Sequence, residues 1–322
     1  MKKIIALFLV FTVLSCSSED PSNQDVALEN SGSVLDGKML SFKSEKAFIK
    51  EYSDLTLFSS EELKEWISSK KLESFLNVSD NSEGIEEDVV PGSRLVYSDA
   101  LKAILNSDLK AKVNGDVIWL NERTFYLLSK NEVNKTSKEL VSQINNLKIY
   151  GSLLSLSNPT ANLTSKNLIP NENRIKTFAS EEMNINGSRL RHVVDLFNET
   201  IYINDQLQSS KMFIRSIMQY RSCSTWRCTW KEASNPRKLS SDLYCAVCQN
   251  GENSPWGFSG NITTTSAVSG TQTYLIGNWH LINVLQPQNQ FPNFAISGPL
   301  NCYVTGNTGE NIGGTTVNIS WL

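Results

Sequence analysis

The sequence predicts an α+β protein, in which a small helix-rich N-terminal region with a β-hairpin precedes a larger antiparallel β region, folded as a sandwich or a strongly bent sheet. Three observations predict this class. Apolar residues recur at helical intervals in much of the segment 41–148. The same segment carries an Asn-Gly pair between two runs that contain apolar residues, which indicates a hairpin. From about residue 186 onward, apolar and polar residues alternate with period two between Gly and Asn turns.

Capping patterns mark where helices begin in the N-terminal region. Ser59 stands three residues before Glu62, and Thr136 stands three residues before Glu139, which is the spacing of a capping box. A shorter helix is expected from Ser98 to Asn106, because its apolar residues fall on one side. The sequence therefore predicts helices at these three places.

Strands are predicted where the period changes. Asn114-Gly115 separates two short runs that would pair as a hairpin, and Arg123 to Leu128 would add a third strand. In the C-terminal half, alternating residues share one face in each of three runs: Leu190, His192, Val194 and Leu196; Met212, Ile214, Met218 and Tyr220; and Val317, Ile319 and Trp321. Strands of this length favour antiparallel packing.

These patterns divide the chain into five segments. Residues 1–15 are expected to be a signal peptide. Residues 16–40 are expected to be a flexible tether, because they are rich in Ser, Asn, Asp and Glu and poor in large apolar groups. Residues 41–148 are the helix-rich region. Residues 149–184, dominated by Ser, Asn and Thr, would connect it to the β-rich domain of residues 185–322.

The first residues have the pattern of a secretory signal. Lys2 and Lys3 form a short positive region, and the apolar run from Ile4 to Leu14 is much shorter than the about 20 residues that a membrane-spanning helix needs. The Ser15-Cys16 step that follows resembles the lipobox of bacterial lipoproteins. This resemblance implies cleavage before Cys16 and acylation of that cysteine. Ordinary signal cleavage nearby, with Cys16 as one more cysteine, is the alternative.

The four residues after this cysteine are polar. Ser17, Ser18, Glu19 and Asp20 resemble the export signal of Bacteroidota surface lipoproteins, in which serine and acidic residues follow the lipidated cysteine. The resemblance implies an outer-membrane protein that is held by its N-terminal lipid and faces the cell exterior.

The body of the chain resembles a loose group of uncharacterised Bacteroidota lipoproteins. In that group a short helix leads into an Asn-Gly or Gly-Asp hairpin, here Ser98 to Leu128, and a β region with basic strands and tryptophans follows, here about Arg189 to Trp230. The resemblance covers roughly half of the chain and implies a surface location, without an established activity.

Five cysteines lie in the C-terminal half. Cys223, Cys228, Cys245 and Cys248 are clustered, and Cys302 stands apart. Thiols of an exported protein tend to oxidise, so disulfides are expected, and a zinc knuckle is the alternative. Because a C-x2-C disulfide is tight, Cys245 and Cys248 are expected to bond to Cys223 and Cys228. Cys302 is expected to remain free.

No catalytic or cofactor site is predicted. The chain contains two histidines, His192 and His280, each in an alternating strand where a structural role is expected, and no common catalytic, nucleotide or calcium motif is present. No metal site is assigned. The formal net charge is −3, without a long basic run, which argues against nucleic acid as a partner.

Tryptophans provide the remaining indication of function. Trp256 lies in a turn-rich segment and is the candidate ligand-binding residue, because exposed aromatic rings bind sugars and protein partners. Trp226, Trp230 and Trp321 are expected in the core. The function predicted is non-enzymatic binding of an extracellular glycan or an envelope protein. A secreted glycosidase-like hydrolase with a carboxylate pair and a structural envelope component are the alternatives.

Overall fold

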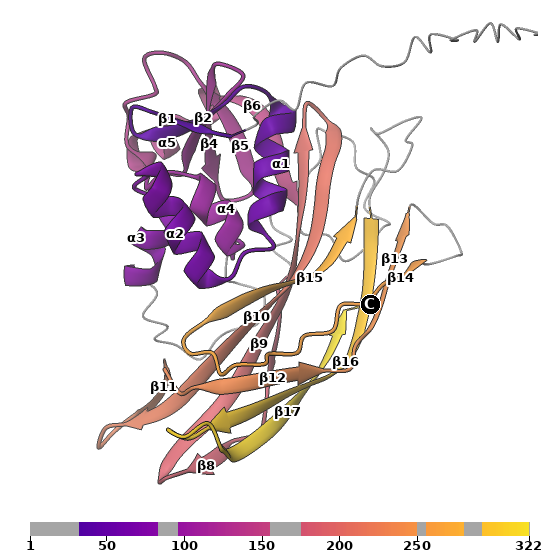
Figure 1. Cartoon of the computed structure of the whole chain (residues 1–322). Coiled ribbons are helices and arrows are strands. Elements are labelled where there is room, and N and C mark those ends of the chain that lie inside the picture. Colours follow the sequence, from indigo (N-terminus) through magenta and orange to yellow (C-terminus); the bar gives the residue numbers. More distant parts are fainter. Residues whose placement is uncertain (1–31, 83–95, 155–174, 250–255, 280–291, 322) are drawn as a thin grey trace, which may run out of the picture. The chain divides into compact units, whose positions relative to one another are not determined.

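The protein is mostly β. The computed structural model describes residues 32–82, 96–154, 175–249, 256–279 and 292–321, and Gly32–Leu322 forms one compact unit. Strands hold 52% of the described residues and helices 18%, around a large curled mixed sheet (Figure 1). The predicted α+β class, with a helix-rich N-terminal region separate from a β region, is therefore wrong.

The N-terminal part contributes strands to the same sheet as the C-terminal part. Its elements are β1 (Val34–Asp36), β2 (Met39–Phe42), α1 (Glu45–Leu55), α2 (Ser60–Lys70), α3 (Phe75–Ser82), α4 (Asp99–Ile104), β3 (Lys110–Val113), β4 (Asp116–Asn121), β5 (Thr124–Leu128), α5 (Ser137–Ser142), the 3-10 helix η1 (Ile144–Asn146) and β6 (Lys148–Leu154). These helices are short, and the six strands join the long strands that follow. That continuity is the reason why no separate helical region exists.

The first sheet has twelve strands in the order β1-β2-β3-β4-β5-β6-β9-β10-β11, with β7 and β8 on β9 and β15 on β10. Strands β2 and β3 are parallel, while the other pairs are antiparallel. The remaining members of this sheet are β7 (Lys176–Ala179), β8 (Met183–Ile185), β9 (Ser188–Ile203), β10 (Gln206–Cys223), β11 (Cys228–Glu232) and β15 (Gln272–Trp279). Strands β6 to β8 thus lie largely in the segment that the sequence suggested was a connection.

Strands β9 and β10 form the spine of this sheet. They pair with each other along most of their length. The other edge of β9 pairs with β8, β7 and β6 in succession. The other edge of β10 pairs with β15 and then with β11. One long antiparallel ribbon therefore joins the helical part of the protein to its C-terminal strands.

A second sheet of five strands packs against one face of this ribbon. Its strands are β12 (Arg237–Ser241), β13 (Tyr244–Gln249), β14 (Trp256–Gly257), β16 (Pro292–Thr305) and β17 (Asn311–Trp321). The even-numbered side chains of the ribbon, among them Val194, Leu196 and Ile214, share a core with Phe294 and Trp321 of the second sheet. The alternation predicted for these runs is thus present, with one apolar face buried.

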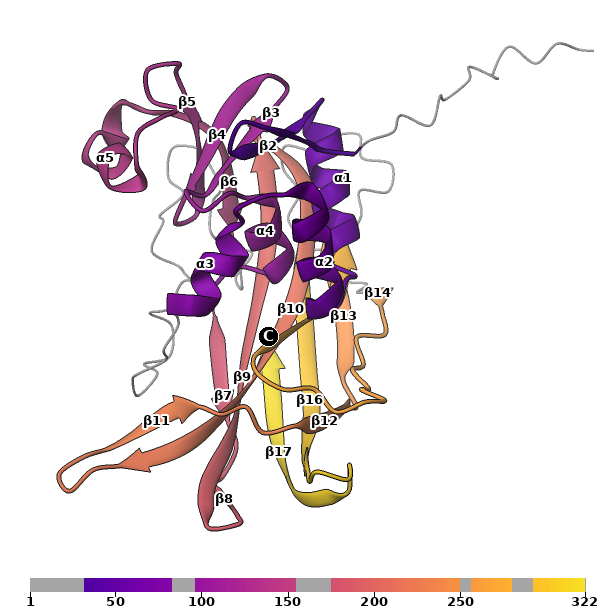
Figure 2. The ribbon, with the colours of Figure 1, turned by 60° about the vertical axis from the view of Figure 1, so that its left-hand side comes forward.

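Helices α1, α2 and α4 cover the strands of the N-terminal part. Phe48, Tyr52 and Leu63 from these helices share a core with Ile118 and Ile201 from the strands. In Figure 2 these helices lie in front of the upper part of the β9–β10 ribbon. The first sheet is therefore covered by helices at one end and by the second sheet at the other.

Several local sequence signals are confirmed. Both capping boxes, at Ser59 with Glu62 and at Thr136 with Glu139, are formed. Ser98 caps α4. The Asn-Gly turn joins β3 to β4, with positive φ at Asn114 (53°) and Gly115 (86°), as a type I′ hairpin requires.

Candidate functional site

The odd-numbered face of the β9–β10 ribbon carries buried charges. Asp195 and Glu199 in β9 and Lys211 and Arg215 in β10 are each at most 3% exposed. Residues two apart in a strand share a face, and this face turns toward the helices. Buried charges are tolerated only with close polar partners, so each of these side chains must be held in one place.

Asp195 and Arg215 are cross-strand neighbours and form an ion pair. The Nε atom of Arg215 lies 3.0 Å from Oδ2 of Asp195. Thr177 of β7 donates its hydroxyl hydrogen to the other carboxylate oxygen at 2.8 Å. This pair fixes the Arg215 side chain at the wall of a cleft.

Glu199 holds the start of helix α4. Its carboxylate accepts hydrogen bonds from the Tyr52 hydroxyl (2.6 Å), the Ser98 backbone N–H (2.6 Å) and the Ser98 hydroxyl (2.7 Å). Burial raises the pKa of Glu199, and these hydrogen bonds oppose the rise. Because Ser98 is the N-cap of α4, this contact sets where Asp99 and Lys102 project from that helix.

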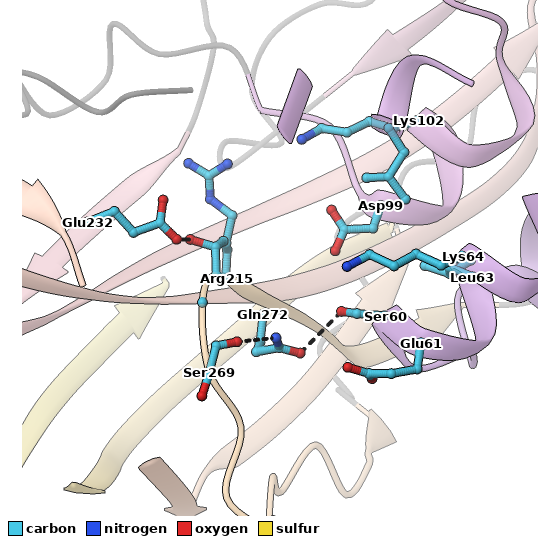
Figure 3. Close-up of a pocket in the computed structure, with 13 residues that line it drawn as sticks. Ser60, Glu61, Leu63, Lys64, Asp99, Lys102, Arg215, Glu232, Ser269 and Gln272 are labelled. Atoms are coloured by element: carbon cyan, nitrogen blue, oxygen red, sulfur yellow. Dashed lines mark hydrogen bonds between the residues drawn. The ribbon is translucent and has the colours of Figure 1, made fainter. Parts of the chain in front are cut away.

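The cleft lies between helices α2 and α4 on one side and β10, β11 and the segment 269–272 on the other (Figure 3). It has a volume of about 310 Å³. Its lining includes three carboxylates, three cations and four uncharged polar side chains: Glu61, Asp99, Glu232, Lys64, Lys102, Arg215, Ser60, Ser269, Thr271 and Gln272.

The segment 269–272 is held by hydrogen bonds from three directions. Thr271 donates to Glu232 of β11 at 2.7 Å, and Ser60 of α2 donates to the side-chain carbonyl of Gln272 at 3.2 Å. From behind, the buried guanidinium of Arg237 in β12 donates to the Gly270 carbonyl at 2.8 Å and the Ser216 carbonyl at 2.9 Å. The wall of the cleft is therefore preorganised.

The chemistry of the cleft is that of a hydrogen-bonding site. Carboxylates accept, lysines and Arg215 donate, and the amide of Gln272 does both. No aromatic side chain lines it among the residues that the structure describes. Asp99 and Glu232 stand on opposite walls (Figure 3). Such a surface suits a ligand with many hydroxyl or charged groups.

A second cavity, of about 440 Å³, lies beside β2 and β3. Lys112 bonds Asp36 at 2.7 Å, and the Lys110 ammonium donates to the Val133 carbonyl at 3.0 Å. Two of the three lysines that line it therefore already have partners within the protein. Within the described residues, no three His, Cys, Asp or Glu side chains converge to hold a metal ion.

The predicted N-terminal and ligand-binding residues lie outside the described parts. Cys16, with Ser17, Ser18, Glu19 and Asp20, precedes the first described residue. The backbone of Trp256 belongs to β14 and pairs with Val247, but its side chain is outside the described set. Across the described ranges, no helix combines the length and apolar character needed to cross a membrane.

The cysteines are arranged differently from the prediction. Cys223 and Cys228, directly opposite in β10 and β11, form a disulfide with each other. Cys245 is a buried free thiol. The prediction that Cys223 and Cys228 would bond to Cys245 and Cys248 is therefore wrong for Cys223, Cys228 and Cys245. Cys302 is a buried free thiol, as predicted. The side chain of Cys248 lies outside the described set.

Two tryptophans are buried as predicted, and one is not. Trp230 and Trp321 are 9% and 0% exposed, whereas Trp226 is 95% exposed. The prediction for Trp226 is wrong because the strand ends at Cys223, and residues 224–227 form a turn beyond it. His192 is buried and its Nε2 lies 2.8 Å from the Ser216 hydroxyl, which fits the predicted structural role. His280 falls in an undescribed segment.

Sequence reasoning missed the cleft itself. Asp99, Lys102 and Glu232 are ordinary charged residues in the sequence, and no motif distinguishes them. The available signal is that Lys211 and Arg215 flank the apolar run Met212–Ile214, in a strand that is buried on both faces.

Comparisons with known proteins assign no family to the chain. No protein-family model matches it, and no curated protein matches it. It is similar to a solved structure, a DUF4848 family protein from Bacteroides thetaiotaomicron, with 11% identity, a TM-score of 0.22, and coverage of 89% of this chain and 100% of that chain. A TM-score of 0.22 does not establish a common fold.

Proposed function

We propose that this chain is a lipid-anchored protein of the outer cell surface that binds an extracellular glycan in the cleft, without catalysing a reaction on it. The observation that carries the proposal is the dense set of hydrogen-bonding side chains around a cavity of about 310 Å³. Ligand sites typically begin at about 300 Å³. A cleft of this size admits one or two sugar units, whereas an envelope protein needs a broad surface of several hundred Å² per partner.

Buried interactions behind the cleft support this proposal. Glu199 holds α4, the Asp195–Arg215 pair holds one wall, and Arg237 holds the segment 269–272. Side chains held in this way bind without first losing conformational entropy, which is the main advantage of a preorganised site. A surface that only faced water would not need supports of this kind.

The binding test uses the chain from residue 16 with Cys16→Ser, screened on a glycan array and titrated by calorimetry. Asp99→Asn keeps the shape of the side chain and removes its charge. We expect this variant to bind about tenfold more weakly, equivalent to about 1.4 kcal/mol. Glu65→Gln, on the exposed side of α2, is the matched control and should bind as wild type does. Equal affinity of Asp99→Asn and wild type for every glycan bound would refute the cleft as the site.

The lipid anchor and the location on the cell surface are proposed from the N-terminal sequence. Cys16→Ala should abolish lipid labelling and release the protein from the membrane fraction. Replacement of Glu19 and Asp20 by Lys should keep the anchor and remove surface exposure, measured by protease treatment of intact cells. A Cys16→Ala protein that stays membrane-bound after a high-salt wash would contradict the anchor.

A hydrolase is the second candidate, favoured by one observation. Asp99 and Glu232 come from opposite walls of the cleft (Figure 3), and two carboxylates across a substrate are the machinery of most glycosidases. Release of reducing ends from a bound glycan, abolished in Glu232→Gln with binding retained, would establish the hydrolase and overturn the non-enzymatic proposal. Binding without product release over days would support the binding protein.

A further inference from the structure

The β10–β11 hairpin ends in an exposed tryptophan held by a disulfide. The tip loop is defined here as Cys223–Cys228, and it extends past the neighbouring strands (Figure 2). The Trp226 side chain is 95% exposed, more than any other large hydrophobic side chain that the structure describes. Isolated exposed apolar side chains are common on protein surfaces, but this indole combines a large flat apolar area with a polar N–H, the features that make Trp frequent in binding sites.

The tip loop is ordered without the help of other elements. The disulfide joins residues that face each other across the two strands. Inside it, the Ser224 N–H donates to the Arg227 carbonyl at 2.8 Å, and the Arg227 N–H donates to the Ser224 hydroxyl at 3.2 Å. The disulfide closes only four intervening residues and so orders this turn rather than the domain. Trp226 is therefore presented on a preformed turn, which lowers the entropy lost on binding.

The surroundings of the tip loop are cationic, although the whole chain is slightly acidic. Arg227 is exposed beside Trp226, and Lys231 follows along β11. Glu182 lies within 3.5 Å of Arg221 and 3.7 Å of Arg189, so one carboxylate is shared by two guanidinium groups. An anionic partner fits this charge, and the indole face fits the C–H face of a sugar ring.

Strand β11 links the tip loop to the cleft. Cys228 at its outer end closes the loop, and Glu232 at its inner end lines the cleft. Four strand residues of about 3.3 Å each separate them by about 13 Å, which is longer than one sugar ring. A ligand that reaches from the cleft to Trp226 must therefore be a chain of several units.

We infer that the tip loop is a second contact site for an acidic polysaccharide, with the Trp226 indole stacking on a sugar ring and Arg227 pairing with its carboxylate or sulfate groups. This inference rests on the proposed binding of a glycan in the cleft and specifies its class and length. A lipid bilayer fits less well, because membrane-binding surfaces present several apolar side chains together and the tip loop presents one.

The experiment compares chain lengths and charges. The probes are digalacturonate, polygalacturonate, dextran sulfate and neutral dextran, with vesicles of zwitterionic and anionic phospholipid as a separate arm. We expect Trp226→Ala to weaken binding of the acidic polymer that wild type prefers by at least about tenfold and to leave digalacturonate binding unchanged. Arg227→Gln should weaken binding of the acidic polymer about threefold or more at low salt, and by a smaller factor at high salt. Tyr244→Ala and Lys46→Gln, exposed elsewhere, are the controls.

The outcomes separate the tip loop from the cleft. Suppose that Asp99→Asn weakens the binding of both short and long ligands, while Trp226→Ala binds polymer as wild type does. The tip loop inference then fails, and the proposal that the cleft binds glycan is supported. If Trp226→Ala weakens polymer binding and Asp99→Asn does not, the tip loop stands and the cleft proposal fails. Preference for neutral dextran, or Trp226-dependent binding to anionic vesicles without polysaccharide binding, would overturn the assignment to acidic polysaccharide.

Discussion

The two faces of the β9–β10 ribbon are both buried, but they are built from different chemistry. The even-numbered face packs Val194, Leu196 and Ile214 against the second sheet. The odd-numbered face also buries apolar residues such as Phe197, but it alone holds charged groups, among them Asp195 and Glu199, toward the helices. An apolar face is stabilised by area removed from water, about 25 cal/mol per Å². A charged face gains little net free energy from its pairs.

This difference shows which face has a role beyond stability. Apolar residues of matching volume would replace a buried ion pair at little or no cost, and often with a gain. The charged face is instead suited to holding polar groups in fixed positions, since the geometry of Asp195–Arg215 and of Glu199 with Ser98 is directional. On this ribbon the apolar residues of the even face therefore mainly stabilise the fold, whereas the charged residues of the odd face, together with Arg237 anchored on Ser216, position the cleft.

The largest expected effect comes from breaking the ion pair. Arg215→Met leaves the Asp195 carboxylate buried without its guanidinium partner and should lower the free energy of unfolding by about 3–5 kcal/mol. The double variant Asp195→Asn/Arg215→Met removes both charges, and the amide oxygen that it introduces would still accept from the Thr177 hydroxyl. Urea unfolding of both variants measures the effect. If the double variant were no more stable than Arg215→Met, the buried charge would not be the cause of the loss.

The neighbouring residue tests the opposite face. Ile214→Ala should lower the free energy of unfolding by about 2–5 kcal/mol, because its fully buried side chain leaves a cavity in the core with the second sheet. The folded fraction should bind glycan with wild-type affinity, whereas folded Arg215→Met should bind more weakly. Calorimetry under conditions where each variant is folded decides this. Weaker binding by folded Ile214→Ala would show that the two faces do not divide their roles.

Local features of the fold were predictable from sequence, because their causes are local. A Ser or Thr three residues before a Glu is enough to start a helix, and Asn114-Gly115 adopts positive φ at low cost. The even-face alternation from Leu190 to Leu196 also needs only the period of two.

Other features depend on contacts between distant residues. Short strands such as β1 and β7 contain only two apolar residues each, too few to show a pattern, and they form because β2 and β9 offer partners. This is why the tether and connection predicted from composition contain strands. The disulfide was misassigned for a similar reason, since the pairing of Cys223 with Cys228 follows from where β10 ends. Asp99 and Glu232 are about 130 residues apart and come together only in the folded chain.

A pH dependence tests a polar residue on the even face. Burial, with the nearby Arg237 charge, lowers the pKa of His192 from 6.5 to about 3. The unfolded chain therefore binds a proton between these values that the folded chain does not, so stability falls as pH falls below 6.5. Titration of His192 should lower the free energy of unfolding by roughly 2–3 kcal/mol between pH 6 and pH 4.

The control for this measurement is His192→Gln, which keeps a polar partner for Ser216 and does not titrate. The raised pKa of Glu199 acts in the opposite direction, because the folded chain retains that proton to higher pH, and it is common to both proteins. The difference between the two pH profiles therefore isolates His192. Parallel profiles from pH 7 to pH 4 would contradict a lowered pKa.

The smallest expected effect on stability concerns the disulfide. Cys223→Ser/Cys228→Ser opens a loop of four intervening residues at the end of a hairpin, and the chain-entropy estimate for so short a loop is about 2 kcal/mol at most. This hairpin end extends beyond the cores, so it can fray locally without unfolding the domain. Most of the lost stability should therefore be local, and the global melting temperature should change by a few degrees or less. Hydrogen exchange should instead accelerate at residues 221–230 and remain unchanged in β9. A large drop in melting temperature would mean that the disulfide stabilises the whole sheet, and that the tip loop is part of the fold rather than a preformed binding element.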